Sequence, residues 1–254
     1  MRFRFPIAIL AGLTLLAPAR GRAGPPYVTD DPEPVEYRHW EVYVASQVHV
    51  AAHDLDGAAP LVEANYGAAP DLHLHVGASL AFARADGPTR FGFGDVEVGA
   101  KVRLVHEDGP VPTVAIFPML SIPTGRASNG LGNGAAQLFL PLWIQKRWGA
   151  WQTNAGAAYG VNWARDGKDW WFAGWQAQYA FPSVATLGAE LFYTTSHDRG
   201  GDPDFAFNVG LVLDLADSHH LLLSAGRDFV GPTRFQGYLA YQFTVGRSEE
   251  PFAP

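Results

Sequence analysis

The stretch from Trp151 to Trp163, WQTNAGAAYGVNW, decides the fold of this chain. Large apolar and small residues alternate along it with polar residues and glycines, and a period of two is that of a β-strand. At about 3.3 Å per residue and a tilt of about 40°, the stretch rises roughly 30 Å, the height of the apolar band of a membrane barrel. A tryptophan at each end would then lie at each membrane interface.

The preceding stretch, residues 137 to 148 (QLFLPLWIQKRW), repeats the pattern beyond a two-residue turn. One parity is aliphatic, and Trp148 faces Trp151 across the turn. Lys146 falls on this apolar parity, but it is close enough to Trp148 for its long side chain to reach the interface. Two neighbouring strands with apolar outer faces and polar inner faces are thus predicted, with three apolar residues on the inner parity as exceptions: Phe139, Pro141 and Trp143.

The composition leaves few classes of protein open. The chain has 254 residues, 48% of them hydrophobic and 17% charged, and it contains no cysteine. No run of about 20 apolar residues follows the N-terminal segment, which excludes membrane-spanning helices but not a barrel. A net charge of −7 argues against nucleic-acid binding, which needs a basic face. Residues 1 to 23 have the features of a cleaved secretory signal: Arg2 and Arg4, an apolar core, and Gly21-Arg22-Ala23.

After a proline-rich acidic leader (24 to 38), strand candidates fill residues 39 to 244. Connections after the even candidates are short and those after the odd ones are longer, an asymmetry typical of outer-membrane barrels with periplasmic turns. The predicted fold is all-β, an antiparallel up-and-down transmembrane β-barrel of about 12 strands with a periplasmic tail (245 to 254). The candidates are 39–51, 60–68, 71–83, 91–106, 111–123, 135–148, 151–163, 169–181, 185–195, 204–215, 219–228 and 234–244.

A soluble periplasmic β-barrel that binds a ligand is the remote alternative. In the candidates 169–181 and 204–215, aromatic residues gather toward the ends with small or aliphatic residues between them, as lipid favours, whereas a soluble core would place its large residues centrally. The segment QGYLAYQF (236 to 243) also resembles the signal that the barrel-assembly machinery recognises, although further residues follow it here. We therefore expect a barrel in the bacterial outer membrane, with the lipid bilayer and that machinery as partners.

Three further segments carry a family resemblance: the leader and first strand GPPYVTDDPEPVEYRHWEVYVAS, the stretch GDVEVGAKVRLV, and PMLSIPTG. In order and spacing they resemble a family of transporter-like outer-membrane proteins described as "MetA-pathway of phenol degradation". The resemblance covers most of the chain after the signal. It implies an outer-membrane barrel that passes small, often aromatic, compounds.

Polar residues on the inner parity are the candidates for lining a pore. They can hydrogen-bond a polar solute, or they can satisfy one another in a barrel too narrow to conduct. His73 and His75 point the same way, with Glu63 or Glu97 nearby, but no tight ligand spacing repeats, so neither a metal nor another cofactor is predicted. No catalytic residues are predicted either, so we expect no enzyme. The lining candidates are Glu41, His49, Glu63, His73, His75, Glu97, Lys101, Arg103, Asn154, Gln176, Glu190 and Asn208.

The leader carries a second hypothesis. Its carboxylates Asp30, Asp31 and Glu33 could dock on the basic residues at 101, 103 and 147 and plug the periplasmic mouth, or the leader could be a mobile tether. The predicted function is passive passage or binding of a small, partly apolar and possibly aromatic solute. A structural or adhesive protein without transport is the alternative. Solute identity, direction and oligomeric state have no signal in the sequence.

Overall fold

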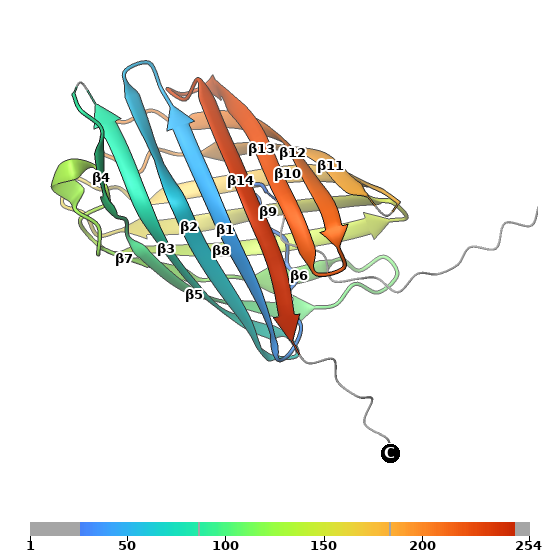
Figure 1. Ribbon diagram of the computed structural model, residues 1–254. Coiled ribbons are helices and arrows are strands. Elements are labelled where there is room, and N and C mark those ends of the chain that lie inside the picture. The colour runs from blue at the N-terminus through green and yellow to red at the C-terminus, as the bar shows by residue number, and fades with distance from the viewer. Residues whose placement is uncertain (1–25, 86, 183, 247–254) are drawn as a thin grey trace, which may run out of the picture.

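The computed structural model describes residues 26–85, 87–182 and 184–246, which form a closed antiparallel β-barrel (Figure 1). The expected signal, the first two residues of the leader and most of the expected tail lie outside the described residues. Among the described residues, no helix is long and apolar enough to cross a membrane.

From β1 to β3 and from β8 to β14 each strand pairs with the next strand in the chain, and β1 closes the barrel against β14. Both β4 and β5 pair with β3, and both β6 and β7 pair with β5 and β8, so the 14 labelled strands make a barrel of 12. This confirms the predicted fold class. The strands are β1 (His39–Val50), β2 (Asp54–Ala69), β3 (Leu72–Ala85), β4 (Arg90–Phe93), β5 (Val96–Val105), β6 (Thr113–Ile116), β7 (Met119–Ile122), β8 (Gln137–Trp148), β9 (Trp151–Asn162), β10 (Trp170–Phe181), β11 (Ala185–Thr194), β12 (Asp204–Ala216), β13 (His219–Val230) and β14 (Phe235–Gly246).

Two of the expected strands are interrupted. The expected strand 91–106 breaks between β4 and β5, where the Asp95 carboxylate accepts hydrogen bonds from the backbone of Gly125 and Asn133 in the β7–β8 loop. The expected strand 111–123 breaks between β6 and β7 at Pro118, which has no N–H to donate to a ladder. The hydrogen bonds of Asp95 and the missing N–H of Pro118 thus interrupt strands that the alternation of apolar and polar residues predicts to be continuous.

Some boundaries also differ from the expected ones. β2 begins at Asp54 instead of Pro60, because the pairing shifts between Ala58 and Leu61 and thereby accommodates the proline inside the strand. The β1–β2 connection is consequently short, while the connection from β5 to β6 is longer than expected. β14 continues to Gly246, past the expected end of the barrel. We call the end with the β2–β3, β8–β9 and β12–β13 connections the short-turn end, and the other the long-loop end.

The outer surface is apolar. Leu140 is 43% exposed and Val209 is 48% exposed, and tryptophans lie near both ends of β9. A soluble barrel would bury these aliphatic side chains in a central core, so the soluble alternative is wrong. Lys146 does not stay in the apolar face, because its ammonium binds Glu107 at 2.8 Å and a backbone carbonyl of the β5–β6 turn.

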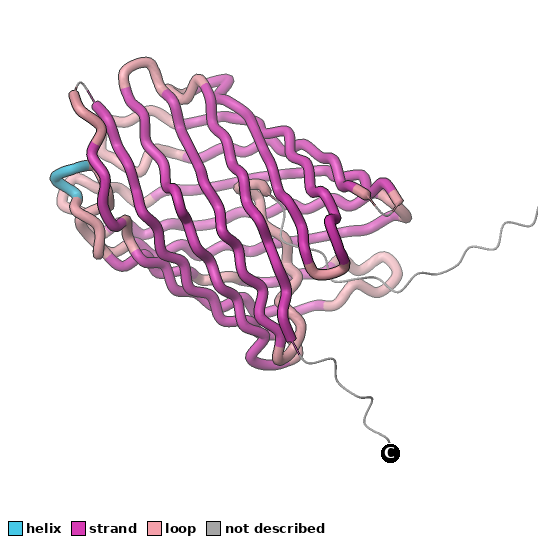
Figure 2. Tube along the Cα trace, in the orientation of Figure 1, coloured by secondary structure: helices cyan, strands magenta, loops and turns pink. Residues whose placement is uncertain are grey.

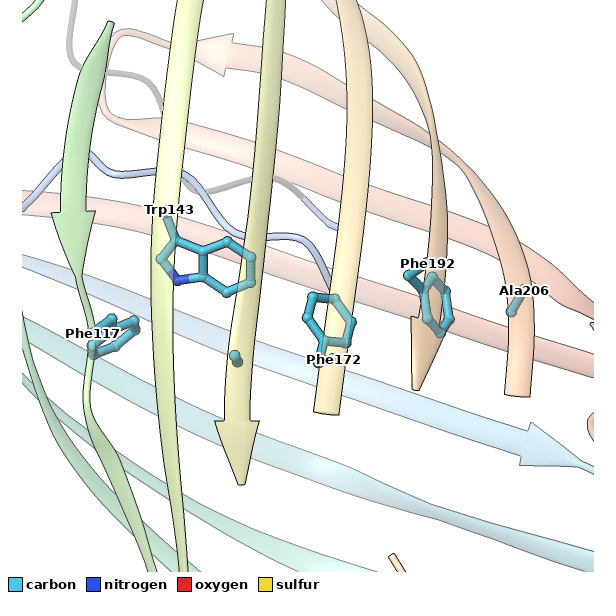
Figure 3. Close-up of a cluster of buried hydrophobic side chains, with 6 residues drawn as sticks. Phe117, Trp143, Phe172, Phe192 and Ala206 are labelled. Atoms are coloured by element: carbon cyan, nitrogen blue, oxygen red, sulfur yellow. The ribbon is translucent and has the colours of Figure 1, made fainter. Parts of the chain in front are cut away.

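The inner surface of one wall carries a row of large aromatic residues that we call the aromatic belt (Figure 3). It explains why Phe139 and Trp143 fall on the inner parity: Trp143 is 1% exposed, and Phe139 packs against the belt. Gly156 provides the room, because a Cβ there would meet the Trp143 ring. The belt extends from Phe117, directly after β6, across the neighbouring strands β8 to β12. It consists of the aromatic residues Phe117, Trp143, Phe172 and Phe192 together with Ala158 and Ala206.

Candidate functional site: the leader in the lumen

The described part of the leader lies inside the barrel, where Figure 2 shows it as a loop enclosed by the strands. It leaves β1 at the short-turn end and reaches Gly210, the middle of β12, where the Tyr27 hydroxyl donates a 3.1 Å hydrogen bond to the Gly210 carbonyl. Burial raises the pKa of the Tyr27 phenol, so this group stays a donor. The leader therefore spans part of the lumen instead of trailing outside it.

The β10–β12 wall holds the leader by its backbone. The Glu190 carboxylate accepts the N–H groups of Val28 and Thr29, each at 2.9 Å. The Gln176 side-chain amide donates to the Thr29 carbonyl at 2.9 Å. Hydrogen bonds from a carboxylate to N–H groups are charge-assisted and stronger than neutral ones. Three backbone polar groups that enter the lumen without strand partners are satisfied in this way.

Amide side chains of the barrel wall form hydrogen bonds with Glu190 and with one another. Asn208 donates to the Glu190 carboxylate at 2.6 Å and accepts from Gln236 at 2.7 Å. Gln178 donates to the Gln176 carbonyl oxygen at 2.9 Å. These residues face the lumen from β10, β12 and β14, and each hydrogen bond fixes the orientation of the next side chain.

The opposite part of the leader binds basic residues of β5. The Lys101 ammonium lies 2.8 Å from Asp30 and 3.6 Å from Asp31, and Arg103 lies 2.6 Å from Glu33. Two carboxylates thus share one ammonium. Burial raises the pKa of Asp31 to about 7, with the Asp30 charge adding to the rise and Lys101 opposing it.

The same β5 arginine also joins the leader to the barrel rim. Arg103 binds Asp71 in the β2–β3 turn at 2.8 Å while it holds Glu33. The Arg103 and His106 side chains lower the pKa of Asp71, which is largely open to solvent. Glu33 additionally accepts from Gln145 at 2.9 Å and lies 3.4 Å from Arg147. The basic group predicted at 101, 103 and 147 is therefore brought together on the leader.

Glycines make room for the leader on the β10–β12 wall. A Cβ at Gly210 would meet the Tyr27 ring at 2.5 Å, and one at Gly174 would meet the Thr29 hydroxyl at 2.1 Å. Real Cβ atoms essentially never approach so closely. The leader and this wall consequently fit each other only where the strands lack side chains.

The two lumen histidines take part in hydrogen bonds, and each has a different partner. His73 Nδ1 accepts the backbone N–H of Val35 at 3.1 Å, which places its proton on Nε2. His75 Nδ1 lies 2.7 Å from the Asn65 amide oxygen, and its Nε2 lies 3.3 Å from Glu97. No group of three or more metal-ligating side chains within the described ranges is arranged to hold a metal ion.

A cavity of about 1270 Å³ remains beside the leader. The leader forms one side of it, and inner-face residues of β1, β2, β3, β13 and β14 form most of the other, with Lys101 and Arg103 of β5, Arg147 of β8 and Asn208 of β12. Tyr43 and Tyr238 belong to its lining, together with residues at the short-turn end such as Asp217 and Thr244. Of the aromatic belt, Phe117 alone among the described residues lines the cavity, so the other belt residues fill a different part of the lumen.

The predicted lining residues thus fall into three groups. Seven line the cavity: Glu41, His49, Glu63, His73, His75, Lys101 and Arg103, joined by Asn208 from the supporting amides. Gln176 and Glu190 bind the leader, while Asn154 is fully buried and accepts from Gln152 at 3.2 Å. Glu97 lies outside the cavity lining beside His75, and its side chain is 43% exposed.

Sequence reasoning missed several residues of this site. Tyr27 and Gln145 have polar contacts in the lumen, and Gly174 and Gly210 accommodate the leader. Gln145 lies on the inner parity of its strand, so parity could have found it. Nothing in the sequence shows that a particular glycine will contact a distant segment, and Tyr27 and Gly210 are 183 residues apart.

Comparisons with known proteins agree with this architecture. The structure superposes on an outer membrane channel from Pseudomonas putida F1 with a TM-score of 0.72 at 16% identity, covering 85% of this chain and 98% of that one. It also matches the KdgM porin (TM-score 0.54, 12% identity, 80% and 98% covered) and the NanC porin (TM-score 0.54, 9% identity, 82% and 100% covered). At these identities the likeness shows the fold, that of outer-membrane barrels.

No curated protein sequence matches the chain. One family model does, over residues 39–243, which is nearly all of the barrel. The chain therefore belongs to the family described as "Putative MetA-pathway of phenol degradation".

Proposed function

We propose that the barrel passes a small, partly apolar solute passively across the outer membrane, through the space between the leader and the β1–β3 and β13–β14 walls. The observation that carries the proposal is the cavity of about 1270 Å³, which extends beside the leader from the short-turn end to His49 near the other end of β1. Cavities of drug-sized ligands have about 300–1,000 Å³, so a single aromatic ring fits easily.

The leader acts as a constriction in this proposal. It is bound by charge-assisted contacts on β5 and β11, and its prolines reduce the entropy lost on docking. The short-turn end faces the periplasm, in keeping with the short periplasmic turns of such barrels. Membership of a family named for phenol degradation supports an aromatic solute.

Liposome swelling with neutral phenolic solutes tests the proposal. Liposomes that contain the purified protein should swell faster in a small phenol derivative than protein-free liposomes. Deletion of residues 24 to 36 should raise both swelling rate and single-channel conductance several-fold. A barrel that stays tight to every solute, with and without the leader, would favour the alternative of a structural or adhesive protein without transport.

A variant of unchanged length separates plugging from simple chain loss. Replacing the three leader carboxylates by amides (Asp30→Asn, Asp31→Asn and Glu33→Gln) removes the contacts to Lys101 and Arg103 but keeps every atom of the leader's backbone. If the leader is a docked constriction, this variant should approach the conductance of the deletion. If the leader is a tether, both variants should conduct like the wild type.

A further inference from the structure

The cavity is lined by more acidic than basic residues. Lysine and arginine side chains in its lining are Lys101, Arg103 and Arg147, and acidic ones are Asp30, Asp31, Glu33, Glu36, Glu41, Glu63 and Asp217. Four histidines, His39, His49, His73 and His75, also line it. An unbalanced charge matters inside a narrow space between low-dielectric walls, because these walls concentrate the electric field along the path of a solute.

The basic residues are already paired. Lys101 binds Asp30 and Asp31, and Arg103 and Arg147 both bind Glu33. These ion pairs join the leader to the barrel, and the Lys101 charge, which also acts on Glu41, is shared among several carboxylates. Among the described residues, neither Glu41 nor Glu63 forms an ion pair with a basic side chain.

Glu41 is surrounded by neutral hydrogen-bond donors. Tyr43 donates to it at 2.9 Å, the Gln242 amide at 3.0 Å and the Asn65 amide at 3.4 Å. Such donors favour the charged form of the carboxylate, whereas its burial opposes that form. Gln242 is 1% exposed, and its side-chain amide oxygen has no hydrogen-bond partner among the described residues.

Glu63 lies on the neighbouring strand β2 and belongs to the lining of the cavity. It pairs in register with Gly77 on β3, and Gly77 pairs with Glu97 on β5. Two glutamates therefore flank a residue with no side chain on the inner wall. Glu97 has His75 at 3.3 Å, whereas Glu63 lines the cavity and forms no ion pair among the described residues.

We propose that Glu41 and Glu63 make the lumen selective for charge, so that it passes neutral solutes and cations, such as small organic ammonium ions, and rejects anions. In chemical terms a neutral phenol or an aromatic amine passes, and a carboxylate of the same size does not. The inference rests on the proposed function, since selectivity requires that the lumen conducts.

The reversal potential across a planar bilayer in a tenfold KCl gradient tests the inference. K⁺ and Cl⁻ move almost equally fast in water, so the sign of the potential reports the charge preference of the lumen. The wild type should favour K⁺. Glu41→Gln and Glu63→Gln should each lower the K⁺/Cl⁻ permeability ratio by at least about fivefold, because one unit charge about 4 Å from an ion in water changes the occupancy of that ion by about this factor. Asp108→Asn, an equal charge change at an exposed position of the β5–β6 connection, should leave the ratio unchanged.

The outcomes separate this inference from the proposed function. A conducting wild type with a ratio at or below one, or a Glu41→Gln/Glu63→Gln double variant with an unchanged ratio, would overturn the charge selectivity alone. A protein that conducts neither with nor without its leader would overturn both. Retention of the compact, heat-modifiable form on gels confirms that each variant is a folded barrel, and amide substitutions of nearly equal size favour that result.

Discussion

The ammonium of Lys101 lies 2.8 Å from the carboxylate of Asp30, and this contact joins the leader to β5 in the interior of the barrel. Lys101 is 4% exposed, so both charges of the pair are largely withdrawn from bulk water. A pair of this kind is stable only while both partners remain, because an unpaired buried charge costs several kcal/mol.

Lys101→Gln should therefore release the leader, at a cost of about 3–5 kcal/mol to its docking. The chain has no cysteine, so a single Thr29→Cys substitution places one thiol at a position that is 0% exposed in the docked leader. Maleimide labelling of that thiol should be slow with Lys101 present and at least tenfold faster with glutamine. Lys168→Gln, an exposed lysine in the β9–β10 loop, should not change the rate. Equal labelling of both lysine variants would mean that the pair does not hold the leader.

Gly210→Ala should displace the Tyr27 end of the leader, because the added Cβ would lie 2.5 Å from the Tyr27 ring. The matched control is Gly77→Ala on β3, where the nearest atom would be 3.4 Å away, an ordinary contact distance. Thiol labelling at Thr29→Cys should rise with the first substitution and stay unchanged with the second. A further Tyr27→Ala substitution in the Gly210→Ala background should remove the steric conflict but not the docking by Asp30, so labelling should fall again.

The barrel itself could be predicted from sequence because lipid and water impose a period of two on every strand. Trp151 and Trp163, at the two ends of an alternating stretch, indicate where that stretch meets the two membrane interfaces. Breaks within strands have no such signature. Pro118 was visible in the sequence, but the β4–β5 break depends on Asp95 binding backbone groups of a distant loop, which only the fold brings together.

Of the contacts that hold the leader, only those between opposite charges could be predicted from the sequence. Opposite charges attract wherever the chain places them, so Asp30 and the basic residues of β5 could be matched in advance. Glu190 was expected to line the lumen, but its bonds to two backbone N–H groups carry no sequence signal, since every residue offers the same N–H. The aromatic belt was visible as exceptions to parity, Phe139 and Trp143, without a reason for them.

Glu190→Ala should loosen the leader around Val28 and Thr29, because the backbone N–H groups of these two residues lose their acceptor. Hydrogen bonds to a charged group contribute about 1.5–3 kcal/mol each, so amide hydrogen exchange at these two residues should accelerate by at least about tenfold. Glu190→Gln keeps one acceptor oxygen and should give an intermediate rate. Protection that is equal in the wild type and the alanine variant would show that Glu190 does not bind the leader backbone in solution.

Docking of the leader should weaken as the pH rises through about 7. Because burial raises the pKa of Asp31 to about 7, the docked leader binds a proton more tightly than a free leader, whose carboxyl has a pKa of about 4. The stabilisation from this proton is fully present below about pH 4 and is lost above about pH 7. Labelling at Thr29→Cys, corrected for the pH dependence of a free thiol, should therefore increase between pH 6 and pH 8.5. Asp31→Asn, which cannot ionise, should abolish that increase, and a corrected rate that falls with pH would contradict the assignment.

Trp143→Ala should destabilise the barrel far more than Trp163→Ala, although Trp143 lies on β8 and Trp163 directly follows the neighbouring strand β9. Trp143 is 1% exposed inside the aromatic belt, in edge contact with Phe172 at 5.9 Å between ring centroids, whereas Trp163 is 55% exposed on the outer surface. Removing a buried tryptophan leaves a cavity and costs about 3–5 kcal/mol, while an exposed ring loses few packing partners. Urea titration of the folded fraction on heat-modifiability gels measures both effects without relying on fluorescence. Because Trp143 lies outside the cavity lining, its folded variant should conduct like the wild type, and a large change in conductance would show that the belt belongs to the solute path.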